Sequence, residues 1–264
     1  MPFPESERVI YGKNPLTEVI CQLRFPTILR IGTEQVADFQ DRIRQDYPLY
    51  EARGPSVQFP DLPEQFAPIV ASMQLPKTAQ VVTHRFSTVD NSRAISLSQD
   101  FVALVESRYE RWESFRDEMR KGETALRNVY KPAFYSRIGL RYRDMIMRSS
   151  LGLSGVPWKE LLKPHVLGVL GEDGIADQVR VLRTETLIAI PDIPHSQVKI
   201  IHGVFEDAAT KEECYSIDSD FSTHRKGDTS DPFEVLDRFH RLAGCLFRWT
   251  ITDNLHTAME PSTI

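Results

Sequence analysis

The chain has 264 residues, of which 41% are hydrophobic, 9% aromatic and 26% charged. This composition is typical of a globular protein and excludes collagen-like, coiled-coil and intrinsically disordered chains. The 32 Lys and Arg residues against 37 Asp and Glu residues give a formal net charge of −5. Bulk charge therefore does not favour a protein that coats nucleic acid, although a local basic face stays open.

The cysteines predict a reducing compartment. Cys21, Cys214 and Cys245 are odd in number, far apart and never in a C-x-x-C pair, which argues against both a disulfide framework and a zinc site. The N-terminus has no basic region followed by an apolar stretch, and no window approaches the roughly 18 apolar residues of a membrane span. We therefore expect a cytoplasmic protein without a membrane partner.

The first half of the chain predicts a strand, a helix, three strands and a second helix. Leu16 to Pro26 alternates between apolar and polar residues, as a half-buried strand does, and a helical stripe from Val36 to Ile43 follows. Five prolines between Gly54 and Thr78 predict an extended connection. The remaining elements are strands over Gln80–Phe86, Ala94–Ser98 and Phe101–Glu106, and an amphipathic helix from Trp112 to about Val129.

The second half repeats this order. Phe134 to Ile146 alternates as a strand, and Pro157 to Leu162 begins a short helix. Asp231-Pro232-Phe233-Glu234 supplies an N-cap, a proline at the first helical position and a glutamate at the third, which predicts a long final helix. Three strands are expected between these helices, over Val179–Ile190, Val198–Phe205 and Cys214–Phe221.

Two short matches favour an internal duplication. Ile95–Phe101 matches Tyr215–Phe221 at an offset of 120 residues, and Leu23-Arg24-Phe25 matches Leu140-Arg141-Tyr142 at an offset of 117. Because each match precedes a helix of the same kind, we interpret the chain as a single domain, 1–264, built from two repeats over about 12–130 and 131–256.

The expected fold class is therefore α+β. Two strand-helix-strands-helix units would form one continuous antiparallel sheet with the helices on one face. In element order this topology resembles the TATA-binding-protein-like fold, a likeness that carries no function by itself. The alternative is a helix-grip fold, in which a curved sheet wraps the long C-terminal helix and encloses a ligand cavity.

The N-terminal stretch Asn14–Pro26 and the following Ile28–Ile31 form the motif NPLxEVICQLRFPxILRI. With this motif the chain resembles a sporadically distributed bacterial family of uncharacterised proteins, and the likeness extends through Tyr109–Trp112 and Gly139–Tyr142 to cover most of the chain. The family has no assigned activity, cofactor or catalytic residue, so the resemblance transfers no site. Its sporadic distribution resembles that of mobile defence or toxin–antitoxin genes.

One predicted strand carries a basic face. In Phe134–Ile146, alternate residues place three arginines on one side, and Ser136 and Asp144 interrupt the apolar opposite side. Guanidinium groups suit phosphate and carboxylate, so this face is a candidate anion or nucleic-acid surface. The alternative is a solvated face whose arginines pair with acids on neighbouring strands. The candidate binding residues are Arg24, Tyr135, Arg137, Arg141 and Arg143.

No motif indicates a metal, a cofactor or a nucleophile. The seven histidines show no H-x-x-x-H or H-E-x-x-H spacing, and neither a G-x-G-x-x-G nor a P-loop motif is present. Ser216, Asp218, Asp220 and His224 match no nucleophile elbow. We therefore predict no catalytic residues and no cofactor.

Three functional hypotheses follow. The first is a non-enzymatic binding or interaction protein, with a protein partner, in a bacterial defence or toxin-neutralising operon. The second is nucleic-acid binding through the basic face. The third is an enzyme with an unrecognised site, which would show itself as a deep pocket holding convergent ionisable groups with shifted pKa values.

Overall fold

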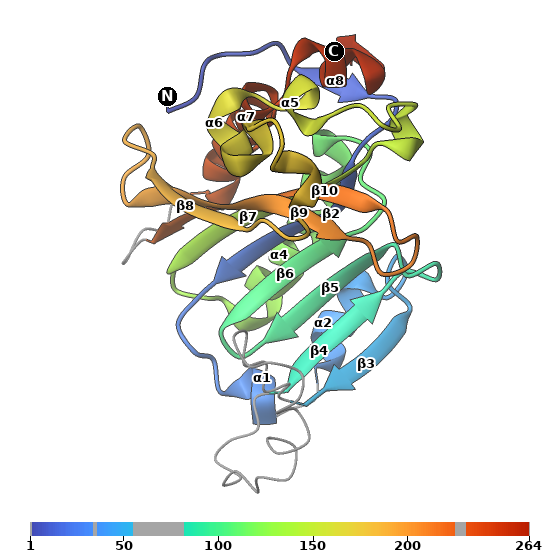
Figure 1. Cartoon of the computed structure of the whole chain (residues 1–264). Helices are drawn as coiled ribbons and strands as arrows, with labels where there is room; N and C mark the ends of the chain where they lie inside the picture. Colours follow the sequence, from blue (N-terminus) through green and yellow to red (C-terminus); the bar gives the residue numbers. More distant parts are fainter. Residues whose placement is uncertain (1, 34–35, 55–81, 225–230, 264) are drawn as a thin grey trace, which may run out of the picture.

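The computed structural model describes residues 2–33, 36–54, 82–224 and 231–263. Within these residues the fold is α+β, and nine strands form one antiparallel sheet in the order β3-β4-β5-β6-β2-β7-β10-β9-β8 (Figure 1). The predicted antiparallel sheet is therefore confirmed. From residue 55 onward, the proline-rich connection expected between Gly54 and Thr78 lies outside the described residues.

The strands of the large sheet follow the alternating segments of the sequence. Their bounds are β2 (Leu16–Arg24), β3 (Leu49–Arg53), β4 (Thr83–Ser87), β5 (Arg93–Ser98), β6 (Phe101–Glu106), β7 (Arg137–Met147), β8 (Thr184–Ala189), β9 (Ser196–Glu206) and β10 (Glu213–His224). A separate ribbon joins β1 (Val9–Tyr11) to β11 (Pro261–Thr263), so the two ends of the chain lie side by side.

Helices occupy the connections. Their bounds are α1 (Arg30–Thr33), α2 (Ala37–Ile43), α4 (Trp112–Tyr130), α5 (Trp158–Leu161), α6 (Pro164–Leu167), α7 (Pro232–Thr250) and α8 (Asp253–Ala258). Short 3₁₀ turns lie at η2 (Ser149–Leu151), η3 (Gly168–Gly171) and η4 (Ala176–Gln178). No helix within the described residues is both long and apolar enough to cross a membrane.

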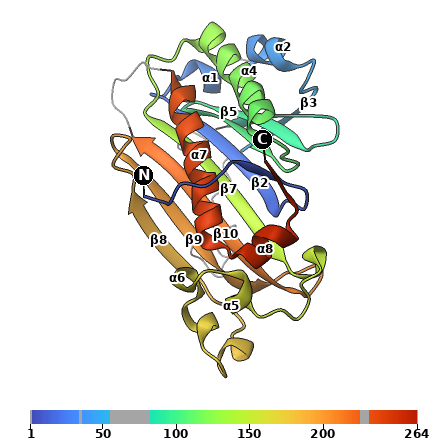
Figure 2. The same cartoon turned by 90° about the horizontal axis from the view of Figure 1, so that it is seen from above.

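The two long helices, α4 and α7, lie on the same face of the sheet (Figure 2). The predicted start of α7 is confirmed, because the Asp231 side chain accepts a hydrogen bond from the backbone N–H of Phe233 at 3.1 Å, with Pro232 in the first turn. Asp237 of α7 joins the helices, since its carboxylate accepts from Trp112 Nε1 at 2.7 Å and from Arg116 Nε at 2.9 Å. These bonds fix α4 beside α7.

The core fills the space between these helices and the sheet. In β7 the even-numbered residues from Ile138 to Ile146 face the helices and are buried, as the sequence predicts. Their neighbours on β2, which include Cys21 and Leu23, are fully buried as well. This central β2–β7–β10 part of the sheet is the platform on which the candidate site lies.

The predicted duplication is not evident in the structure. Ile95–Phe101 covers the end of β5, a tight turn at Gln99-Asp100 and the first residue of β6. Its proposed counterpart Tyr215–Phe221 lies wholly inside β10, where Ser219 and Asp220 continue the strand. The two segments share an alternating apolar pattern without sharing a structural setting, because amphipathic strands and hairpins use similar residues.

Candidate functional site

The predicted basic face forms in part. Arg137, Arg141 and Arg143 lie together on the sheet face opposite α4 and α7. Arg137 Nη2 donates to both carboxylate oxygens of Asp220 at 3.1 and 3.0 Å, and Arg141 makes a bidentate pair with Asp218. The carboxylate partners come from β10, the neighbouring strand in register.

Arg143 and Arg24 also have acidic partners. Arg143 Nη1 lies 3.0 Å from Glu18 Oε2, and Arg24 Nη2 lies 3.6 Å from Asp100 Oδ2. Each arginine of this face therefore contacts a carboxylate, which is the arrangement expected of a solvated, paired sheet surface. Binding of nucleic acid or protein at this face stays a prediction.

Tyr135 does not flank the arginines. It precedes β7, is buried, and donates its hydroxyl to Glu123 Oε1 of α4 at 2.8 Å. The chain has not yet entered the strand at residue 135, so the alternation that places Arg137 on the open face does not extend back to Tyr135. Burial, followed by the nearby Glu123, raises the pKa of this phenol.

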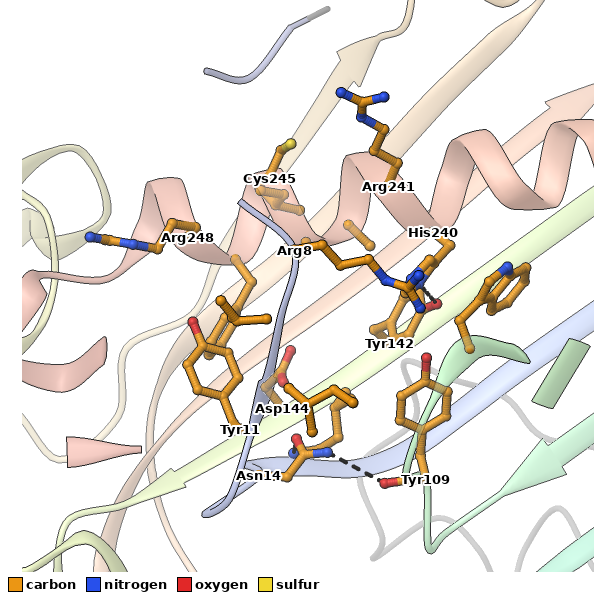
Figure 3. A pocket seen from close by; sticks show the side chains of 18 of the residues that line it. Arg8, Tyr11, Asn14, Tyr109, Tyr142, Asp144, His240, Arg241, Cys245 and Arg248 are labelled. Carbon is orange, nitrogen blue, oxygen red and sulfur yellow. Dashed lines mark hydrogen bonds between the residues drawn. The ribbon is translucent and has the colours of Figure 1, made fainter. Parts of the chain in front are cut away.

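A cavity of about 510 Å³ lies on the opposite side of the sheet, beneath α7 (Figure 3). Its floor comes from β2, β7 and β10, one wall from α7, and another from the segment Tyr109–Trp112 that leads into α4. The N-terminal segment Ser6–Tyr11 lines it as well. Six segments of the chain thus converge on one space.

The sheet register builds the floor. Tyr142 of β7 pairs with Ser219 of β10, and Asp144 pairs with Ile217. Since residues two apart on a strand share a face, all four side chains point toward α7. A register shift in β2 between Leu16 and Glu18 brings Leu16 opposite Asp144 and completes the floor on that side.

Asp144 is the polar group at the centre of this floor. It is 6% exposed, and no described residue forms a hydrogen bond or an ion pair with its carboxyl. Burial is the main reason that the pKa of this carboxyl rises from 3.8 to about 8, and the negative charge of Asp218 adds to the rise. The acid is therefore largely protonated at neutral pH.

A second polar group lies across the cavity, where Tyr142 Oη is 2.9 Å from His240 Nδ1. The Trp112 ring stacks on the His240 imidazole with centroids 4.7 Å apart and planes 7° from parallel. Burial, followed by the positive charge of Arg8, lowers the pKa of His240 to about 4. His240 is thus an uncharged imidazole held in a fixed orientation by a tyrosine and a tryptophan.

The N-terminal strand β1 covers one side of the cavity. Tyr11 Oη lies 2.9 Å from His256 Nδ1 of α8, and its ring meets Phe247 of α7 edge-on with centroids 5.7 Å apart. Figure 3 shows Tyr11 on one side of Asp144, with Tyr109 and Tyr142 on the other. Aromatic rings therefore flank the buried carboxyl on two sides.

The guanidinium groups around the cavity have carboxylate partners of their own. Arg8 Nη2 contacts Glu113 Oε1 at 2.7 Å, and Arg111 contacts the same glutamate at 3.1 Å. Arg248 pairs with Asp253 and donates to the Ile251 carbonyl at 3.2 Å. None of these partners is Asp144, so the floor carboxyl keeps its position without a cation.

No group of three His, Cys, Asp or Glu side chains within the described residues is placed to hold a metal ion. What the cavity offers instead is one buried carboxyl, one neutral imidazole and a set of aromatic and aliphatic walls. Sequence reasoning missed this site. The sequence feature that could have indicated this site is Asp144, which interrupts the apolar side of a central strand where a hydrophobic residue is expected.

No protein-family model matches the chain, and a search of the curated proteins found no match either.

Proposed function

We propose that this protein binds a small molecule in the cavity between α7 and the sheet. The observation that carries the proposal is Asp144, a buried carboxyl without a described partner that opens into a space of about 510 Å³. Burying a polar group without a hydrogen bond is unfavourable, so a ligand that satisfies it gains affinity. Ligand sites typically have volumes of about 300–1,000 Å³ and mostly apolar walls.

This proposal narrows the first sequence-based hypothesis. The first hypothesis predicts a binding protein whose partner is another protein, whereas the cavity supports a small-molecule ligand. The arrangement of a long helix over a sheet, with a cavity between them, also fits the internal ligand cavity that the helix-grip alternative implies. The interaction with a protein partner stays a prediction.

Gly244 provides a direct test. It lines the cavity in the middle of α7, and a Cβ atom added there meets nothing within 4 Å. Gly244→Trp should therefore place an indole across the space without disturbing the backbone, and Gly244→Ala is the matched control. The assay is the thermal shift of the wild-type protein and both variants against a panel of small apolar and amphipathic compounds, with native mass spectrometry to establish stoichiometry.

Compounds that bind the cavity should raise the Tm of the wild type and Gly244→Ala, and Gly244→Trp should remove that effect. Two results contradict the proposal. One is a panel that contains no stabilising compound, and the other is stabilisation that Gly244→Trp leaves unchanged.

The cavity also supports a second candidate, an enzyme. Asp144 and His240 line the same space, and their pKa values are shifted in opposite directions, to about 8 and about 4. Groups whose environments separate their pKa values in this way serve as acid and base in many active sites. Incubating an identified ligand with the wild-type protein and analysing it by mass spectrometry separates the candidates, since a binding protein returns the ligand unchanged.

A further inference from the structure

We propose, on the basis of the ligand-binding role above, that the cavity selects a ligand with one ammonium group on an apolar or aromatic body. The ammonium group would lie against Asp144, and the body would fill the space under α7. The inference depends on the charges that line the cavity, on its rings and on the burial of the carboxyl.

The lining charges favour a cationic ligand group. Arginines and acidic residues are equal in number among the described lining residues, with Arg8, Arg111, Arg241 and Arg248 against Glu7, Glu110, Asp144 and Asp237. The arginines contact Glu113, Glu5 and Asp253, which do not line the cavity. Glu7 and Glu110 are exposed, and Asp237 accepts two hydrogen bonds. Asp144 is then the buried acidic residue of the lining for which the described residues supply no cation, so a cation that reaches it can form an ion pair once the carboxyl has lost its proton.

The aromatic rings of the cavity also favour an ammonium group. The Tyr109 and Tyr142 rings meet edge-on with centroids 6.1 Å apart, and Tyr11 meets Phe247 in a similar way at 5.7 Å. The hydroxyls of Tyr11 and Tyr142 are already bonded to His256 and His240. A ligand between these pairs therefore meets ring surfaces, whose negative faces attract an ammonium ion.

Binding should release a proton. The free carboxyl is protonated at neutral pH because burial raises its pKa to about 8. When an ammonium ion arrives, the carboxylic acid gives its proton to the buffer, and the carboxylate forms the ion pair, so charge and atoms balance. The other titratable or charged groups of the lining are Glu7, Arg8, Tyr11, Tyr109, Glu110, Arg111, Tyr142, Asp237, His240, Arg241, Cys245 and Arg248. His256 contacts Tyr11 from beyond the lining, and Asp218 acts on Asp144 from the opposite face of the sheet. Of these, His240 is already neutral at pH 7, since its pKa is about 4.

The test is isothermal titration calorimetry with two probes of similar shape, phenethylamine and 2-phenylethanol. At pH 8.5, where most of the free carboxyl is ionised, the wild-type protein should bind the amine about 5- to 10-fold more tightly, the range expected for a charge-assisted hydrogen bond in place of a neutral one. At pH 7, binding enthalpies measured in buffers of different ionisation enthalpy should report release of most of one proton per amine bound. Asp144→Asn should remove both the preference and the proton release, while Gly244→Trp should weaken both probes.

The outcomes separate the two proposals. Equal affinities for amine and alcohol, or no proton release from the wild type, would overturn the ammonium inference. If both probes are still weakened by Gly244→Trp, the ligand-binding role stands. If neither probe binds the wild type, the ammonium inference fails. The ligand-binding role fails as well if the wider compound panel contains no compound whose binding Gly244→Trp blocks.

Discussion

Replacing Asp144 by asparagine should change how the stability of the protein depends on pH. In the unfolded chain the aspartate has its ordinary pKa of 3.8, whereas burial raises the folded value to about 8. Between these values the folded protein holds one more proton than the unfolded chain, so the wild type loses stability as pH rises. The stability that this bound proton contributes is fully present below pH 3.8 and falls as the pH rises from 3.8 to about 8. Above about pH 8 it is lost and does not change further. The amide of the variant does not titrate, so this decline should disappear.

The magnitude follows from the width of the window. One pKa unit corresponds to about 1.36 kcal/mol, so the free energy of unfolding of Asp144→Asn minus that of the wild type should increase by about 4 kcal/mol between pH 5 and pH 8.5. Because Asp144 is 6% exposed, solvent screening reduces this value little. With a urea m-value of about 3 kcal/mol/M, the difference in midpoints should grow by about 1.3 M.

The assay is urea unfolding of the ligand-free wild type and Asp144→Asn at several pH values from 5 to 8.5. Taking the difference cancels the titration of every group that both proteins share. Asp177→Asn is the matched control, since it removes an exposed aspartate and should give a difference close to zero at each pH. A constant difference between wild type and Asp144→Asn over this range would refute the reasoning, because it would mean that the buried carboxyl titrates as it does in the unfolded chain.

Three further predictions concern other residues. Gly244→Ala should raise the free energy of unfolding by about 0.5–1 kcal/mol in urea melts, because a glycine inside α7 costs backbone entropy and its Cβ meets open space. Gly203→Ala should destabilise by more than about 3 kcal/mol, or prevent folding as seen by circular dichroism, because its φ is +155° and the added Cβ would clash with the Leu182 carbonyl oxygen. Arg141→Ala should cost about 1 kcal/mol through loss of its pair with Asp218. If the open face binds nucleic acid, Arg141→Ala should also reduce the salt slope of binding by about 1, and an unchanged slope would exclude a phosphate contact there.

The sheet and the long helices could be predicted because their signals are local. Alternation in Leu16–Pro26 and Phe134–Ile146 predicted the strands that form β2 and β7, and the Asp231-Pro232 cap predicted the start of α7. The short edge strand β3 and the β1–β11 ribbon were missed. The three-residue strands β1 and β11 carry too little alternation to be recognised, and β1 pairs with residues about 250 positions away.

The pairing of the arginines illustrates a different limit. The sequence shows that Arg137, Arg141 and Arg143 share a face, but not which strand lies beside them. Only the sheet order places β10 next to β7 and brings Asp218 and Asp220 into register with these arginines. The local charge of a sheet face therefore depends on strand order, which periodicity does not give.

The cavity could not be predicted for the same reason, since β2, β7, β10, α7 and the N-terminal segment must all be placed before it exists. Yet one of its residues was visible in advance. Asp144 interrupts the buried side of a central strand, where its raised pKa should make the folded protein less stable at pH 7 than an aspartate with an ordinary pKa would. Packing alone would favour an apolar residue there, as it does at Leu140 and Ile146 on the same face. A buried acid that opens into a cavity breaks the local pattern, and such breaks are expected at functional sites, which is why we propose that Asp144 contacts a ligand.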